Sequence, residues 1–325
     1  MGNSWLRKDH IHNVTANGQG GARTSTMTNS VSQGTRSSGW HEGEIALQRR
    51  VGSYEKMAVV GPKVLRPYML DQHREFFAEL PFVVLGSLDG EGRPWATVRC
   101  GAPGFILSPD DTHLKICVGA EAGDPASLEV GAAVGLLGIQ PHTRRRNRAN
   151  GTVEGRSTSG LTIHVTQSFG NCPRFITRRE ALFEPAGAPP PEAERFEFLD
   201  PDACAMIEAA DTFFVASYVR RDDGSADVDV SHRGGEPGFV GIDRVGTLVV
   251  PDYAGNNFFN TLGNFVCHPV CGLLFIDYER GDLLQITGRV SLHLDEASEH
   301  AARHWRVAPQ LMVRRRGALP LRWRS

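Results

Sequence analysis

Two segments in the last third of the sequence have residue types and spacings suited to bind an anionic or planar ligand. In the first, residues 230–239, Arg233 is followed by Gly234 and Gly235. A forked guanidinium beside backbone that a ligand can approach closely suits a phosphate or a heteroatom-rich ring. Pairing of Arg233 with a carboxylate at a hairpin end is the alternative. The adjacent His232 is either a proton donor or, as for most single histidines in strands, structural.

The second segment, residues 247–265, ends a predicted strand at Pro251 and continues through an asparagine-rich turn. We expect residues 257–265 to form a helix whose first-turn N–H groups are free to bind an anion. Asn and Thr side chains in the turn would add hydrogen-bond donors. An ordinary capped helix after a turn is the alternative, because Asn is a favoured cap residue.

The densest basic run is residues 142–148, with arginines at 144, 145, 146 and 148. We predict that it lies in a loop between two strands and either holds the phosphates of a nucleotide or forms a solvated turn. Nucleic-acid binding is disfavoured, because the run lacks interleaved aromatic residues. Residues 168–173 are interpreted as a turn. No partner His can be deduced that would make Cys172 a nucleophile.

No metal centre is predicted, and no catalytic acid, base or nucleophile can be assigned. Cys267, His268 and Cys271 are close in sequence, but no second ligand pair occurs at zinc-finger spacing.

The elements that must position these residues occur twice. Each copy is predicted to have a helix, two strands joined by an Asp/Gly turn, a Pro-Gly-Phe segment and a later apolar strand. In the first copy these are residues 71–79, 81–87, 95–99, 103–105 and 134–139; in the second they are residues 202–210, 212–218, 227–231, 237–239 and 271–276. The short strands and hairpin spacing predict a mainly β protein of two tandem split barrels, antiparallel, each with one or two helices.

Composition divides the chain into three parts. Residues 1–39 are polar with one acid and no apolar periodicity, which predicts a disordered tail. A proline-rich stretch before residue 191 predicts a stiff connector. We therefore expect the first split barrel at residues 40–190 and the second, ligand-binding barrel at residues 191–325.

Length and charge limit the possible partners. The 325 residues are 40% hydrophobic and carry a formal charge of −2. Such a balance gives no global field for nucleic acid or an anionic membrane. No apolar stretch is long enough to span a membrane or to form a secretory signal, so a cytoplasmic protein with small-molecule or protein partners is expected.

Taken together, these segments resemble the pyridoxamine 5'-phosphate oxidase-like family, the split barrels that bind flavin mononucleotide (FMN). The carboxyl-terminal copy carries the resemblance through residues 230–239, 251–264 and 268–276, followed by residues 283–289. The first copy is similar to the amino-terminal half of longer, uncharacterised members. It carries the resemblance through residues 41–44, 92–95, 144–148 and 169–173.

The resemblance implies an FMN whose ring lies between two barrels. The ring would be edged by Ser231, Arg233, Pro251, Asp252 and Tyr253, the phosphate would lie near Asn256, Asn257, Asn260 and Thr261, and Gln285 and Thr287 would reach across from a facing barrel. The sequence departs from the family pattern at residues 256–258, Asn-Asn-Phe, where many members place Arg or Lys. Either Arg233 or the basic run of residues 142–148 compensates, or flavin binding is weak.

The implied function is an FMN-dependent oxidoreductase acting on an unidentified small molecule, with NAD(P)H or oxygen as electron partner. In such enzymes the cofactor performs the redox chemistry and the protein positions it. The alternative is a non-catalytic flavin- or haem-binding module, or an interaction protein with a degenerate pocket. Two barrels in one chain predict an internal pseudo-dimer, and a homodimer of chains is equally open.

Overall fold

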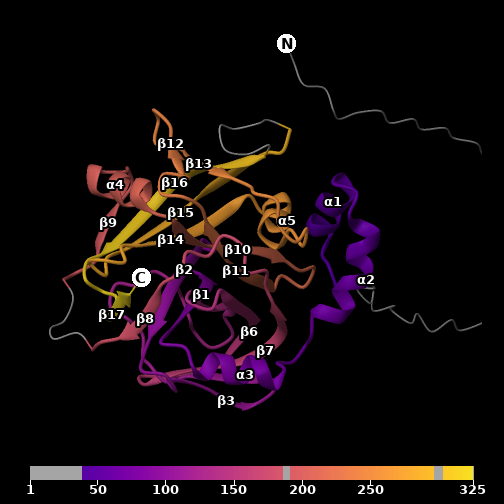
Figure 1. The fold of residues 1–325 in the computed structure, drawn as a ribbon, viewed down its shortest axis with the longest axis horizontal. Helices are drawn as coiled ribbons and strands as arrows, with labels where there is room; N and C mark the ends of the chain where they lie inside the picture. Colours follow the sequence, from indigo (N-terminus) through magenta and orange to yellow (C-terminus); the bar gives the residue numbers. More distant parts are fainter. Residues whose placement is uncertain (1–38, 186–190, 296–302, 325) are drawn as a thin grey trace, which may run out of the picture. The chain divides into compact units, whose positions relative to one another are not determined.

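A computed structural model describes residues 39–185, 191–295 and 303–324. The predicted tail, apart from Gly39, and most of the proline-rich connector lie outside the described residues. The described chain is mainly β, with two large antiparallel sheets and five helices, as Figure 1 shows. The predicted fold class is confirmed.

The first sheet contains seven strands in the order β2-β1-β5-β6-β7-β4-β3. Their bounds are β1 Phe82–Leu88, β2 Pro94–Cys100, β3 Ile106–Asp110, β4 His113–Ile116, β5 Ala133–Gln140, β6 Arg145–Ser157 and β7 Gly160–Gly170. The hairpin β1–β2 forms because Asp89 Oδ1 accepts hydrogen bonds from the backbone N–H groups of Glu91 and Arg93, while Gly92 supplies a φ of +77°.

The basic run of residues 142–148 was predicted to lie in a loop. This prediction is wrong for Arg145 to Arg148, which belong to strand β6.

The second sheet repeats this arrangement, with the order β11-β10-β14-β15-β16-β13-β12. Its strands are β10 Thr212–Arg220, β11 Ala226–Gly234, β12 Gly241–Ile242, β13 Leu248–Pro251, β14 Val270–Ile276, β15 Leu283–His293 and β16 His304–Arg315, with β9 Glu194–Phe196 paired to β16. Each strand of the first sheet has a counterpart at the same place in the second. The duplication inferred from the sequence is thus present in the topology.

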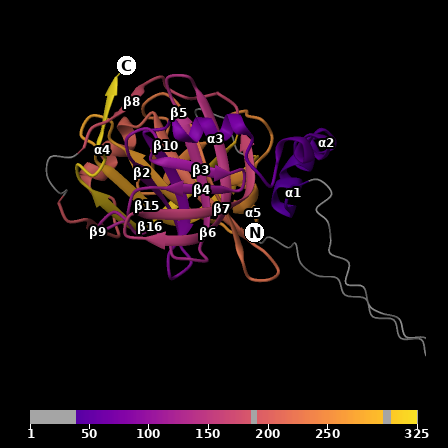
Figure 2. The same cartoon turned by 90° about the horizontal axis from the view of Figure 1, so that it is seen from below.

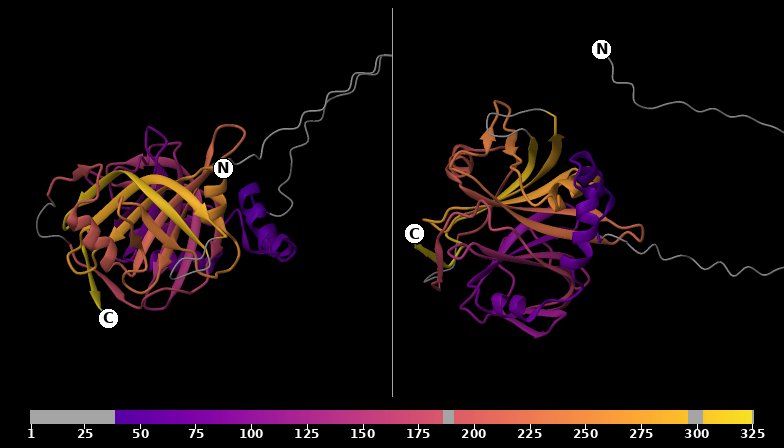
Figure 3. Two further views of the ribbon diagram at one scale, coloured as in Figure 1. Left: turned by 90° about the horizontal axis from the view of Figure 1, so that it is seen from above. Right: turned by 45° about the vertical axis from the view of Figure 1, so that its right-hand side comes forward.

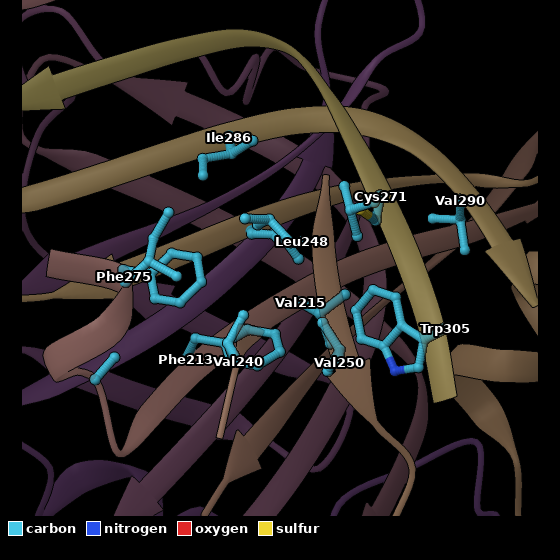
Figure 4. Close-up of a cluster of buried hydrophobic side chains, with 14 of the residues drawn as sticks. Phe213, Val215, Val240, Leu248, Val250, Cys271, Phe275, Ile286, Val290 and Trp305 are labelled. Carbon is cyan, nitrogen blue, oxygen red and sulfur yellow. The ribbon is translucent and has the colours of Figure 1, made fainter. Parts of the chain in front are cut away.

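Each barrel encloses its own apolar core. In the second barrel, alternate side chains from the strands bring Phe213, Phe275 and Trp305 together at 0% exposure (Figure 4). The first barrel has a corresponding core around Phe76, Phe77 and Leu136. A third apolar cluster contains residues of both barrels, including Val84 and Phe214, so the two barrels bury apolar surface against each other.

Two glycines at equivalent places in the two sheets allow this close contact. A Cβ on Gly135 of β5 would lie 2.7 Å from the carbonyl oxygen of Val228, and a Cβ on Gly272 of β14 would lie 2.4 Å from that of Pro94. The side-by-side barrels are visible in Figure 3. The short strands β8, Glu180–Phe183, and β17, Leu321–Arg324, pair with each other in a third sheet.

Five helices accompany the two large sheets in the described residues. Their bounds are α1 Glu42–Arg50, α2 Tyr54–Val64, α3 Asp71–Ala78, α4 Pro201–Ala209 and α5 Asn260–Cys267. Figure 2 shows α3 next to β3. Helix α1 packs on α5, since a Cβ on Gly43 would lie 2.1 Å from the carbonyl oxygen of Gly263. No helix of the described residues is both long and apolar enough to cross a membrane.

Candidate functional site

A cavity lies where the two barrels meet, and we call it the seam cavity. It has about 910 Å³ of empty space, its open mouth included. It is lined from the first barrel by Arg146, Arg148, Asn171, Cys172, Arg174 and Phe175, and from the second mainly by Ser231, His232, Arg233, Pro251, Asp252, Tyr253, Asn256, Asn257, Asn260, Thr261 and Arg303. Nine of the eleven residues that the sequence analysis assigns to cofactor binding are thus brought together in one cavity.

Arg146 is a partly buried cation of the first barrel with no carboxylate partner among the described residues. Its Nε donates to the carbonyl oxygen of Cys172 at 2.8 Å, and its Nη1 lies 3.1 Å from Nδ1 of His232. Burial, followed by the neighbouring charge of Arg148, lowers the pKa of Arg146 to about 10. The guanidinium therefore remains charged at neutral pH.

Arg148 reaches the same cavity two residues further along β6. Its Nη2 donates to Oγ of Ser231, and its Nη1 lies 3.3 Å from Oδ1 of Asp229. Its Nε is buried without a hydrogen-bond partner in the described residues. The guanidinium also lies over the ring of Phe169, 5.3 Å from the centroid. A side chain held this way is preorganised to face a ligand.

Two further arginines share one carboxylate on the second barrel. Arg303 Nη2 lies 2.9 Å from Oδ2 of Asp252, and Arg233 Nη1 lies 3.7 Å from its Oδ1. Burial raises the pKa of Asp252, although both arginines oppose that shift. Arg233 Nε is buried and has no hydrogen-bond partner among the described residues. The cavity wall therefore has more arginine than carboxylate charge and is suited to an anion.

The asparagine-rich turn also lines the seam cavity, through Asn256, Asn257 and Asn260. Asn257 and Phe259 have φ of 61° and 62°, the left-handed region, so the helix begins at Asn260, three residues later than expected. Some of its polar groups already have protein partners: Asn256 Oδ1 accepts from the N–H of Phe258 at 3.1 Å, and Thr261 Oγ1 donates to Ser231 Oγ at 2.8 Å. The cations of the site thus come from elsewhere than the turn.

Helix α1 supports this turn, which the sequence analysis did not foresee. Asn260 Nδ2 donates to Oε1 of Glu44 at 2.6 Å, and Glu44 Oε2 accepts from the N–H of His41 at 3.0 Å. Glu44 is 4% exposed. The His41 to Glu44 spacing is that of a capping box, which predicts a helix start but cannot reveal the contact with residue 260.

A segment of the first barrel covers the rim of the cavity. The ring of Phe175 stacks on that of Tyr253 with centroids 5.0 Å apart, and Arg174 Nη1 donates to the carbonyl oxygen of Ala254 at 3.1 Å. Phe175 has a φ of 61°. Three of the four non-glycine residues with positive φ in the described chain, Phe175, Asn257 and Phe259, line this cavity, and such strain is common at functional sites.

The structure does not bring Gln285 and Thr287 to the seam cavity. In the first barrel Leu136 pairs with Ala149, and in the second the matching pair is Leu273 with Ile286. This register makes Arg148 the counterpart of Gln285, and Asn150 the counterpart of Thr287. The strand position that the resemblance assigned to Gln285 is therefore present at the seam cavity, where Arg148 occupies it. The first barrel supplies this residue, because its strand β6 lies across the seam from the asparagine-rich turn of the second barrel.

Residues 69–176 match the family described as pyridoxamine 5'-phosphate oxidase. Among curated proteins, none matches the chain. The match covers the first barrel, and hence the side of the seam cavity that carries Arg146, Arg148 and Cys172.

Several solved structures are similar to parts of the chain. HupZ of Group A Streptococcus is 12% identical with a TM-score of 0.27, covering 35% of this chain and 98% of that chain. HutZ, the heme storage protein from Vibrio cholerae, is 14% identical with a TM-score of 0.25, covering 36% and 95%. The motility inhibitor MotI of Bacillus subtilis is 11% identical with a TM-score of 0.23, covering 73% and 88%.

Proposed function

Because residues 69–176 match the family described as pyridoxamine 5'-phosphate oxidase, we propose that this chain is a member of that family, binds FMN in the seam cavity and acts as an FMN-dependent oxidoreductase on a small molecule. The observation that carries the proposal is the partly buried guanidinium of Arg146, which has no carboxylate partner among the described residues and lies in the same cavity as the buried Arg148. Cations withdrawn from water in this way are costly unless an anion joins them.

The residues present fit such a cofactor. Arg146, Arg148 and Arg233 converge on the cavity and would hold the phosphate, in place of the Arg or Lys missing from the turn. Asp252 and Tyr253 would edge the ring, and Ser231 would lie beside the phosphate with Arg148 and Arg233. When bound, FMN would supply hydride or electron transfer, with NAD(P)H or oxygen as electron partner. The protein's own part is to position the ring and exclude water through the rim formed by Phe175 and Tyr253.

His232 is not suited to deliver a proton. Burial, followed by the charges of Arg146 and Arg233, holds its pKa well below 6.5, so the ring is neutral at pH 7. A guanidinium only donates hydrogen bonds, so Nδ1 of His232 accepts from Arg146 and Nε2 carries the ring proton. This tautomer also argues against His232 as an axial ligand to haem, since Nε2 would have to lose its proton and Nδ1 is occupied.

We also propose that the two barrels of one chain form the pair that builds the site, without a second chain. Both walls of the seam cavity come from the same polypeptide, which supports this arrangement. Light scattering of the purified protein tests it: the FMN-loaded form is expected to have the mass of one chain. Flavin binding that occurs only in a dimer would contradict it.

Visible absorbance tests the cofactor. Purified protein reconstituted with FMN should show flavin bands that bleach with NAD(P)H or another reductant under anaerobic conditions. A Soret band after haem addition would favour the non-catalytic haem-binding alternative. A folded protein that leaves FMN free would overturn the proposal.

The Arg233→Ala variant tests the site. Loss of one guanidinium facing the phosphate should weaken FMN binding more than tenfold, about 1.4 kcal/mol or more, by flavin fluorescence titration. Arg178→Ala is the matched control, since Arg178 is exposed. Unchanged affinity in Arg233→Ala would remove Arg233 from the cofactor site.

A further inference from the structure

The duplication gives the chain a second seam, related to the first by exchange of the two barrels. Leu85 pairs with Leu136 in the first barrel, and the matching pair in the second is Val215 with Leu273. The same register continues into the neighbouring strand. There Val84 pairs with Val98 in the first barrel, and the matching pair in the second barrel is Phe214 with His232. Thr97 and Arg99 are therefore the counterparts of Ser231 and Arg233, and Gln285 is that of Arg148.

Where the seam cavity is open, this second seam holds a carboxylate. Asp124 Oδ2 accepts from Thr97 Oγ1 at 2.7 Å and from Arg99 Nη1 at 2.8 Å, and Asp124 Oδ1 accepts from Gln285 Nε2 at 3.2 Å. These donors are the counterparts of Ser231, Arg233 and Arg148. The Asp124 side chain is 3% exposed, as is that of Arg99.

A second carboxylate completes the cluster. Glu121 pairs with Arg315 Nη1, and Arg315 Nε donates to Oε1 of Gln285 at 3.1 Å. Arg315 is 3% exposed at its side chain. Glu121 and Asp124 lie in the segment between β4 and β5 of the first barrel, the counterpart of the segment in the second barrel that contains the asparagine-rich turn and α5.

We propose that Asp124 and Glu121 are built-in anions that occupy the cationic groups of the second seam, so that each chain binds one anionic ligand, in the seam cavity, and carries a latent anion site at Arg99 and Arg315. The ligand class is a phosphate monoester or free phosphate. The identity of the natural ligand rests on the proposed function, but the latent site does not, because inorganic phosphate alone probes it.

The second seam also indicates where the anionic group of a ligand lies in the seam cavity. The Asp124 carboxylate occupies the point at which Thr97, Arg99 and Gln285 converge. By equivalence, the anionic group in the seam cavity lies among Ser231, Arg233 and Arg148. The second seam has glutamine where the first has Arg148, so its latent site should bind phosphate more weakly.

Titration with inorganic phosphate, followed by calorimetry or phosphorus NMR, tests the proposal. The full chain should bind one phosphate, and Arg146→Ala should weaken that binding at least tenfold. Adding Glu121→Gln and Asp124→Asn to Arg146→Ala should restore one site per chain. Adding Arg99→Ala to that triple variant should abolish it.

Two phosphates bound to the unaltered chain, or no new site in a folded triple variant, would overturn the proposal. If the triple variant does not fold, Asp124→Asn with Arg146→Ala is the milder substitute, because the amide keeps the hydrogen bond to Thr97 Oγ1. There too a new site dependent on Arg99 is expected, and its absence in the folded protein counts against the latent site. Failure of FMN to bind would instead overturn only the proposed cofactor.

Discussion

At the scale of single residues, the site depends on guanidinium groups held out of water before any ligand arrives. Arg146 is oriented by the carbonyl oxygen of Cys172 and by His232, neither of which neutralises its charge. A ligand phosphate would supply the missing negative charge, and charge-assisted hydrogen bonds to phosphate are among the strongest in proteins. The energetic cost of withdrawing this guanidinium partly from water is then offset on binding.

Arg146→Ala should therefore weaken FMN binding at least tenfold, about 1.4 kcal/mol. Arg144→Asn is the control from the same basic run, because Arg144 is exposed and Asn tolerates its φ of 56°. Its affinity should stay within about twofold of the unaltered protein. Equal losses in both variants, measured by fluorescence titration, would mean that the run acts only through long-range charge.

His232 makes stability depend on pH. Its folded-state pKa lies well below 6.5 because of burial, so below about pH 6.5 the unfolded chain binds a proton that the folded chain does not. Stability should fall as pH drops from 7 to 5, with this residue contributing up to about 2 kcal/mol. Urea unfolding at several pH values should show a shallower slope for His232→Gln.

The matched control is His142→Gln, because His142 is exposed. Its pH slope should equal that of the unaltered protein. His73 and His268 also have lowered pKa values, each mainly through burial, so a residual slope in His232→Gln is expected. An unchanged slope in His232→Gln would show that His232 is not buried in the neutral form.

At the scale of elements, the turn that lines the cavity depends on a helix distant in sequence. Helices α1 and α5 approach so closely that Gly43 and Gly263 leave no room for a Cβ at their contact. This contact brings Glu44 to Asn260, the first residue of α5. The first helix of the described chain thereby fixes one wall of a site formed largely by residues 231–261.

Gly43→Ala should separate α1 from α5. The new Cβ would lie 2.1 Å from the carbonyl oxygen of Gly263, and overpacking of this kind costs about 1 to 3 kcal/mol, more than the helix propensity that Ala gains. Hydrogen exchange should increase in both helices, and FMN affinity should fall. Gly90→Ala, in the β1–β2 turn with nothing within 4 Å, should change neither. Unaltered exchange in Gly43→Ala would contradict the packing.

At the scale of the whole molecule, two copies of one barrel pack through equivalent surfaces, but the two seams between them carry different side chains. Gly135 and Gly272 occupy the same position in β5 and β14, and each lets its strand approach the backbone of the other barrel. The two seams then diverge, because the segment after β4 carries Glu121 and Asp124, whereas the segment after β13 carries asparagines and α5.

Gly272→Ala should destabilise the barrel pair by about 2 kcal/mol or more, because its Cβ would meet the carbonyl oxygen of Pro94 at 2.4 Å. Gly155→Ala, in β6 with its nearest contact at 3.5 Å, is the control and should cost less than 1 kcal/mol, about the usual effect of a tolerated substitution. Thermal unfolding measures both. Equal stabilities of the two variants would mean that the barrels do not contact through β14.

From the sequence alone, the duplicated mainly β architecture and the resemblance to the pyridoxamine 5'-phosphate oxidase-like family could be predicted, and both are confirmed. Alternating apolar residues and Asp/Gly turns are local signals that specify strands and hairpins without reference to the rest of the chain. The residues at the end of β11 and those in the asparagine-rich turn could be assigned to one site, because both belong to the second barrel, where Thr261 donates to Ser231.

Only the tertiary structure decided which barrel lies across from the asparagine-rich turn and which lies across from the segment with Glu121 and Asp124. Gln285 belongs to the second seam and Thr287 donates to the carbonyl oxygen of Cys271, whereas Arg146, Arg148 and Phe175 complete the seam cavity and Glu44 supports it. Two similar copies carry the same local pattern, so sequence cannot say which copy lies across a seam. The packing of one barrel on the other sets those pairings, and it leaves Arg146 without a carboxylate partner among the described residues while it pairs Arg99 with Asp124.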